Sequence, residues 1–125
     1  MGKTMIRFVS LTLALLVVWS CIGNSFFIDY DRQVIIPSKC LIQTGIKCLD
    51  IQTDSSYCHI VLSESVPELD PFCLPDNCVY IGDRSATVFQ KGKKYCITNE
   101  TVGDAGPFSL EVLIDSSGLM KPLSK

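Results

Sequence analysis

The chain has 125 residues, and eleven Lys and Arg stand against thirteen Asp and Glu, which gives a formal net charge of −2. A chain of this length is expected to form one domain with a small core. Proteins that bind nucleic acid present clustered basic surfaces, which this balance does not favour. We therefore expect a single folded domain with no nucleic-acid partner.

Residues 1–23 have the pattern of a secretory signal peptide. Lys3 and Arg7 supply a positive start, the run from 8 to 19 is apolar, and small or polar residues follow. The run is short for a membrane span, and no later stretch is long and apolar enough to be one. We expect cleavage after Gly23, with Ser25 as the alternative, and a secreted, extracellular chain without a membrane span.

A second interpretation of the leader rests on four residues. The tetrapeptide Val18-Trp19-Ser20-Cys21 resembles a bacterial lipobox, although Trp19 stands where a small or β-branched residue is usual. The resemblance implies that Cys21 is lipidated and begins the mature chain. The protein would then be a lipid-anchored envelope lipoprotein.

The cysteines favour a discarded Cys21. Six others remain after the leader, and an even number behind a signal peptide predicts a disulfide framework. The sequence does not choose among the fifteen pairings of six cysteines. A zinc site needs two close cysteine pairs, and only one is present, so we expect neither a metal nor a cofactor. The six are Cys40, Cys48, Cys58, Cys73, Cys78 and Cys96.

The expected elements are short strands separated by turn residues. The first runs from 26 to 36, is interrupted at 29–33, and stops at Pro37. Residues 40–42 and 47–51 form a hairpin around Gly45. A strand follows at 57–62, and prolines then make 63–76 irregular. The remaining strands are expected at 79–81, 86–89, 95–98 and 108–114, before a flexible tail over 116–125.

Together these elements predict the all-β class. We expect residues 24–115 to form a small disulfide-rich single domain, a sandwich- or barrel-like meander of short strands. The segment from 72 to 115 holds four of the strands and three of the six cysteines. We therefore expect it to form the centre of the domain.

The sequence offers little for catalysis. His59 is the only histidine, it lies in an apolar strand, and no serine near it has the setting of a nucleophile elbow. We therefore predict that the protein is not an enzyme. The alternative is a small secreted hydrolase or carbohydrate-active enzyme with paired carboxylates. Its candidate residues are Asp29 and Asp31, or Glu64, Glu68 and Asp70 of the irregular loop.

Two features favour binding. Phe72, Leu74 and Pro75 lie in a loop that Cys73 and Cys78 would hold rigid, and a rigid loop loses little entropy on binding. Arg84 lies at the tip of a predicted turn beyond it. We predict a monomeric secreted protein, built like an effector, toxin or inhibitor, that contacts an extracellular or host protein through these four residues.

One modification site is also predicted. Asn99-Glu100-Thr101 is an acceptor triplet for N-linked glycosylation, so we expect a glycoprotein. Attachment of a glycan requires that Asn99 face solvent.

Overall fold

This computed structural model describes residues 23–38, 45–103 and 105–123, and in them the all-β prediction is confirmed. Every element except one short 3₁₀ helix, η1, is a strand. The elements are β1 (Phe26–Asp29), β2 (Val34–Pro37), β3 (Ile46–Gln52), β4 (Tyr57–Val66), β5 (Val79–Gly82), η1 (Arg84–Thr87), β6 (Lys94–Asn99), β7 (Phe108–Ile114) and β8 (Met120–Pro122).

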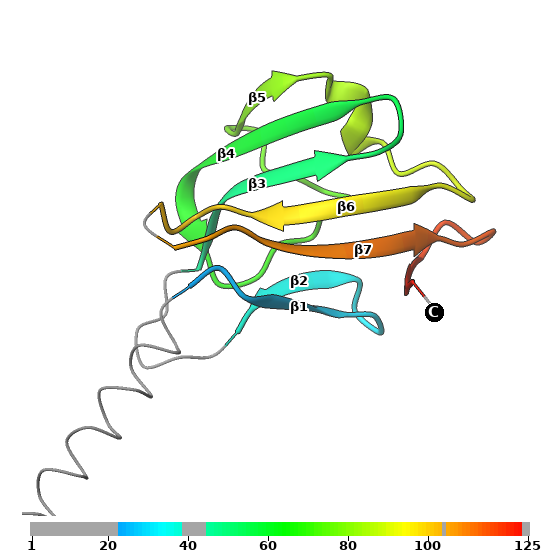
Figure 1. Ribbon diagram of the computed structural model, residues 1–125, viewed down its shortest axis with the longest axis horizontal. Coiled ribbons are helices and arrows are strands. Elements are labelled where there is room, and N and C mark those ends of the chain that lie inside the picture. The colour runs from blue at the N-terminus through cyan, green and yellow to red at the C-terminus, as the bar shows by residue number, and fades with distance from the viewer. Residues whose placement is uncertain (1–22, 39–44, 104, 124–125) are drawn as a thin grey trace, which may run out of the picture.

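The strands form two antiparallel sheets (Figure 1). β1 and β2 make a hairpin, and the other six strands form one sheet in the order β5-β4-β3-β6-β7-β8. Within the described residues β5 and β8 are its two edges, so the sheet does not close into a barrel. The predicted meander is wrong between β5 and β6, where the chain crosses back from the edge strand to the far side of β3.

The crossing begins with η1, where the sequence predicts a strand over 86–89. Asp83 accepts a hydrogen bond from the Ser85 N–H (3.0 Å), and an aspartate in this position favours a helical turn over a strand. Ala86 is fully buried by the turn. The Tyr95 hydroxyl then donates to the Val88 carbonyl (3.0 Å) and fixes the return toward β6.

One face of the six-stranded sheet, the inner face, carries the core. Strand alternation places apolar side chains such as Leu49, Ile60 and Ile97 there, and all three are buried. The β1–β2 hairpin packs over this face, with the Phe26 ring 5.4 Å from that of Phe108. Each such buried side chain contributes about 1.5–3 kcal/mol. The inner face therefore accounts for most of the stability.

Two other boundaries differ from expectation. β4 continues to Val66, because the β3–β4 register shifts between Ile46 and Cys48: extra residues of β4 bulge out there, and Ile46 pairs with Val66. The predicted flexible tail contains β8, which pairs with β7 and buries Met120. Asp115 makes this return because its carboxylate accepts hydrogen bonds from two backbone N–H groups of the turn.

Asn24 ties the start of the described domain to the sheet. Its Oδ1 accepts from the Val102 N–H (2.7 Å), and its Nδ2 donates to the carbonyls of Val102 and Gly106 (3.1 and 3.0 Å). Its own carbonyl accepts from Asn99 Nδ2 (3.0 Å). Asn99 is consequently buried, which corrects the expectation that this glycosylation triplet faces solvent.

Part of the sequence-based prediction lies outside the described residues. This applies to the leader with Cys21, to Cys40, and to the first strand of the hairpin expected around Gly45. In the residues described, no helix is both long enough and apolar enough to cross a membrane.

Candidate functional site

The candidate site lies on the other face of the six-stranded sheet, here called the outer face. Register places its side chains in rows that run across the strands. One row joins Ile81, His59, Asp50 and Thr98, from β5 to β6. The next row joins Tyr57, Gln52, Cys96 and Glu111, from β4 to β7. Unlike the inner face, this face mixes charged, thiol and apolar groups.

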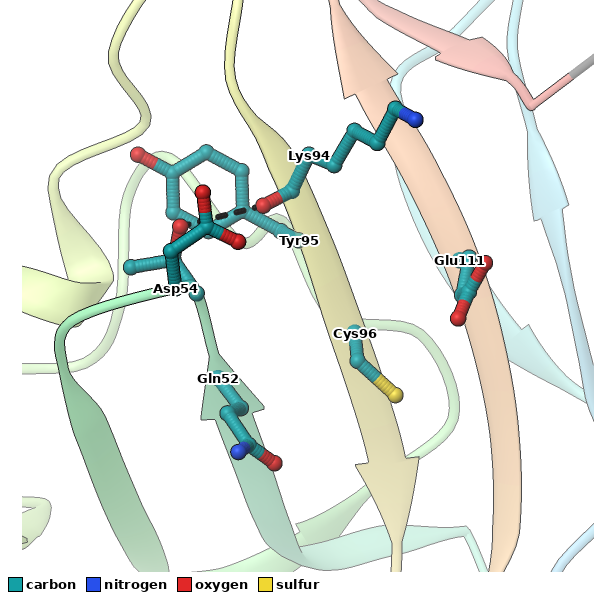
Figure 2. A pocket seen from close by; sticks show the side chains of 7 residues that line it. Gln52, Asp54, Lys94, Tyr95, Cys96 and Glu111 are labelled. Atoms are coloured by element: carbon teal, nitrogen blue, oxygen red, sulfur yellow. Dashed lines mark hydrogen bonds between the residues drawn. The ribbon is translucent and has the colours of Figure 1, made fainter.

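A hollow of about 400 Å³ opens at the end of the second row (Figure 2). Gln52, Cys96 and Glu111 line it from three neighbouring strands, together with Lys94 and Asp54. The Thr53 hydroxyl donates to the Lys94 carbonyl (3.1 Å) and holds the β3–β4 turn against β6. The lining of the hollow combines positive and negative side chains with one thiol, and this combination favours no particular ligand.

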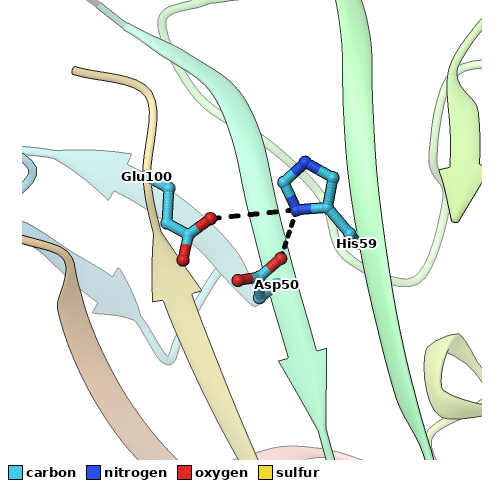
Figure 3. A group of neighbouring side chains, drawn as sticks. All are labelled: Asp50, His59 and Glu100. Carbon is cyan, nitrogen blue, oxygen red and sulfur yellow. Dashed lines mark hydrogen bonds and ion pairs between the residues drawn. The ribbon is translucent and has the colours of Figure 1, made fainter. Parts of the chain in front are cut away.

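Asp50, His59 and Glu100 form a compact cluster in the first row (Figure 3). They come from β3, β4 and the residue after β6. His59 Nδ1 is hydrogen-bonded to Asp50 Oδ1, and it lies 3.8 Å from Glu100 Oε2. The side chains of Asp50, His59 and Glu100 are 10, 24 and 40% exposed. The cluster is therefore partly desolvated yet reachable from solvent.

Negative charge dominates the cluster. The neighbouring Asp50 carboxylate, followed by partial burial, raises the pKa of Glu100. Desolvation, followed by the neighbouring Asp50 and Glu100 carboxylates, raises the pKa of the Tyr57 phenol beside them. Among the described residues, no Lys or Arg forms an ion pair with either carboxylate. Chemically, such a set can hold a shared proton or a cation.

His59 was considered from the sequence, but both of its acidic partners were missed. Asp50 lies nine residues before His59, and Glu100 lies more than forty residues after it. Strand pairing brings them together, and no local spacing indicates it. The one available signal was a charged residue, Asp50, inside the apolar run of 48–51.

Next to this cluster lies an apolar stripe, defined as Tyr57, Val79 and Ile81. These side chains are 46, 57 and 56% exposed, and all three belong to the outer face. Val79 and Ile81 belong to β5, the edge strand, and Tyr57 belongs to its neighbour β4. Asp83 N–H donates to the Tyr57 carbonyl (2.8 Å), so by antiparallel alternation Ile81 and Val79 face β4. The backbone groups of Tyr80 and Gly82 point to the free edge.

Of the four residues predicted to bind a partner, the structure leaves two exposed. Arg84 is exposed, and its guanidinium lies 4.3 Å from the centroid of the Tyr80 ring. Phe72 is 43% exposed, although its ring packs 5.1 Å from that of Phe89. Leu74 and Pro75 are half-buried, and Leu74 packs against the core. Arg84 thus joins the β5 edge, and Phe72 belongs to an aromatic stack.

Three of the carboxylates considered for hydrolysis, those of Asp29, Glu68 and Asp70, are engaged separately. Asp29 Oδ1 accepts from the Asp31 and Arg32 N–H groups and shapes the β1–β2 turn. Glu68 forms an ion pair with Arg32 (2.6 Å). Asp70 accepts from the Phe72 N–H (2.9 Å). Glu64 is exposed near the end of β4.

The five described cysteines form no disulfide with one another. Cys58 is buried on the inner face, where burial raises the pKa of its thiol. Cys48 and Cys96 lie on the outer face, and Cys96 pairs with Gln52 across the strands. Cys73 is exposed in the loop before β5, and Cys78 is half-buried.

The chain was compared with protein-family models, with curated proteins and with solved structures, and none of them matches it.

Proposed function

We propose that this protein is a secreted, non-enzymatic binding protein, and that it holds an extended segment of an extracellular protein against the edge of β5. The observation that carries the proposal is an open strand edge beside the apolar stripe. The backbone groups of Tyr80 and Gly82 find no hydrogen-bond partner among the described residues. An edge of this kind is a template for an added strand.

The chemistry of the edge defines the partner. An added strand would hydrogen-bond to the backbone of Tyr80 and Gly82, and every second side chain would lie on the outer face beside Val79 and Ile81. The partner segment should therefore alternate apolar with polar residues. Arg84, stacked on Tyr80, favours a carboxylate on the opposite side of that strand.

The loop around Phe72 is the second candidate contact. Its support is the exposed part of the Phe72 ring, and it shares Arg84 with the first candidate. Leu74 and Pro75 contribute less surface, because both are half-buried. Binding there would leave the stripe uncovered, so the two candidates are separable by mutation.

Peptide selection tests the proposal without a known partner. A displayed library of random ten-residue peptides would be selected against the folded chain, and binding compared between Ile81→Lys and Val88→Lys variants. Val88 is the matched control because it is a 60% exposed apolar residue outside the stripe. We expect selected peptides to alternate apolar residues, and Ile81→Lys alone to weaken binding by about 2 kcal/mol or more.

The outcome separates the candidates. If peptides bind equally to the Ile81→Lys variant and lose affinity on Phe72→Ala, the loop is the contact and the edge proposal fails. A binding loss on Val88→Lys as large as that on Ile81→Lys would also contradict the assignment to the stripe.

Secretion is part of the proposal, and Asn24 refines the cleavage position. Cleavage after Gly23 keeps Asn24 and its four hydrogen bonds, whereas cleavage after Ser25 removes them and leaves Asn99 Nδ2 without its acceptor. Mass spectrometry of the exported chain should find Asn24 as its first residue. A chain that starts at Cys21 and carries acyl mass would instead support the lipoprotein.

We also propose that the six cysteines oxidise on export. A sheet separates Cys58 on the inner face from Cys48 and Cys96 on the outer face, so a disulfide between the faces is excluded by geometry. Cys58 should pair with Cys40, Cys73 or Cys78. Peptide mapping without reductant tests this, and two or more free thiols in the denatured exported chain would contradict it.

A further inference from the structure

We infer that Asp50, His59 and Glu100 form a binding site for a divalent transition-metal ion of the Zn²⁺ type. This inference does not rest on the proposed partner, because the three ligands belong to β3, to β4 and to the residue after β6, and none belongs to β5. One imidazole and two carboxylates are a ligand set that Zn²⁺ accepts, with a fourth position left for water or for a group of another molecule.

The geometry of the cluster suits such an ion. One ligand atom from each of the three residues lies within 4.8 Å of the others. In a tetrahedral zinc site, ligand atoms about 2.0–2.2 Å from the metal lie roughly 3.3 Å from one another. The 3.8 Å between His59 Nδ1 and Glu100 Oε2 is close to that value. Binding therefore needs only small side-chain rotations, with Asp50 moving back from the imidazole.

The positions of the ligands also favour a built site. Asp50 and His59 are fixed opposite each other by the β3–β4 register, and Asp50 is a buried residue. Glu100 follows β6 at its end, where its N–H donates to the Cys48 carbonyl (3.1 Å). Two ligands on adjacent strands and a third anchored beside them leave little to order when the ion binds.

Charge provides a second argument. The simplest competing explanation is an isolated His59–Asp50 hydrogen bond, which accounts for two of the residues. It does not account for Glu100, a second carboxylate that points at the same imidazole nitrogen (Figure 3). Among the described residues this negative charge has no Lys or Arg within ion-pair distance. A divalent cation would neutralise both carboxylates at once.

The test uses the single histidine of the chain. Every imidazole signal in a ¹H–¹⁵N NMR spectrum belongs to His59, so titration with Zn²⁺ reports on this site directly. We expect these signals to shift and to saturate at one ion per chain. Zn²⁺ bound at thiols elsewhere would leave them in place, so the readout separates the cluster from the cysteines.

Two variants complete the experiment. Glu100→Gln removes a ligand charge with little change in shape, and should weaken Zn²⁺ binding roughly tenfold or more. Glu111→Gln, on the same face but outside the cluster, should leave it unchanged, and amide spectra would verify that both variants are folded. Imidazole signals that do not move in excess Zn²⁺, or equal affinity in the two variants, would overturn the inference.

Discussion

The two edges of the six-stranded sheet differ in whether their outward backbone groups have hydrogen-bond partners. At the β8 edge, one side chain satisfies both backbone groups of Met120. Gln33 Oε1 accepts from the Met120 N–H (2.6 Å), and Gln33 Nε2 donates to the Met120 carbonyl (3.0 Å). Pro122 has no N–H to offer. At the β5 edge, the backbone groups of Tyr80 and Gly82 have no such partner in the described structure.

This difference indicates where another strand can be added. A glutamine amide acts as a substitute for a strand at β8, and Gln33 adopts a positive φ of 57° at its position in the β1–β2 turn. That backbone conformation costs a non-glycine residue roughly 1–2 kcal/mol. The β8 edge is thus closed at the cost of a strained backbone at Gln33. At the β5 edge, Val79 and Ile81 stay exposed, and β5 contains no protective Lys or Pro.

The largest expected contrast concerns stability. Met120 on β8 is fully buried, and Met120→Ala should lower the free energy of unfolding by about 2–5 kcal/mol. Ile81→Ala on the exposed side of β5 should change it by less than about 0.5 kcal/mol. Urea denaturation of both variants under the same redox conditions measures the difference. Equal losses would mean that Ile81 is a packing residue and not an exposed contact.

The second prediction concerns the Gln33 cap itself. Gln33→Ala leaves the Met120 backbone groups without partners and should cost about 1–3 kcal/mol. Hydrogen exchange of the Met120 amide should accelerate at the same time. Gln90→Ala is the matched control, because Gln90 is an exposed glutamine on the path from η1 to β6. An unchanged exchange rate of the Met120 amide in Gln33→Ala would show that Gln33 does not protect this edge.

The third and smallest effect is a pH dependence at the β7–β8 turn. Hydrogen bonds from the backbone N–H groups of Leu119 and Ser117 lower the pKa of Asp115 below its usual 3.8. Because the pKa is lowered in the folded state, the ionised carboxylate stabilises the turn at pH values above the ordinary pKa. This contribution is lost as the pH falls through the folded-state pKa. Amide exchange at Leu119 should therefore rise in acid relative to neighbouring strands, and Asp115→Asn should abolish that dependence.

Much of the strand content was predictable from sequence, because apolar alternation and turn residues are local signals. The segments at 57–62, 79–81, 95–98 and 108–114 all lie in observed strands. The crossing after β5 was not predictable. Val88 and Phe89 look like a strand by composition, but Asp83 caps a 3₁₀ turn before them, and its side chain decides the path.

The candidate sites were less accessible to sequence. Asp50, His59 and Glu100 meet only through the pairing of β3 with β4 and through the end of β6. The sequence does not show this, because strand register is a property of the folded sheet. The exposure of β5 was equally hidden, since a Val-Tyr-Ile run gives no sign of whether its strand is central or at an edge. Arg84 was predicted at the tip of a turn and lies instead in η1, and its stacking on Tyr80 could be seen only in the fold.

The most direct test of the open edge is hydrogen exchange at Tyr80 and Gly82, with and without a peptide selected against the folded chain. Strand addition at β5 predicts fast exchange of both amides in the free protein and strong protection of both in the complex. The Ile81 and Val79 amides, which face β4, should be protected in both states. A tightly bound peptide that leaves Tyr80 and Gly82 exchanging at the free rate would contradict the account.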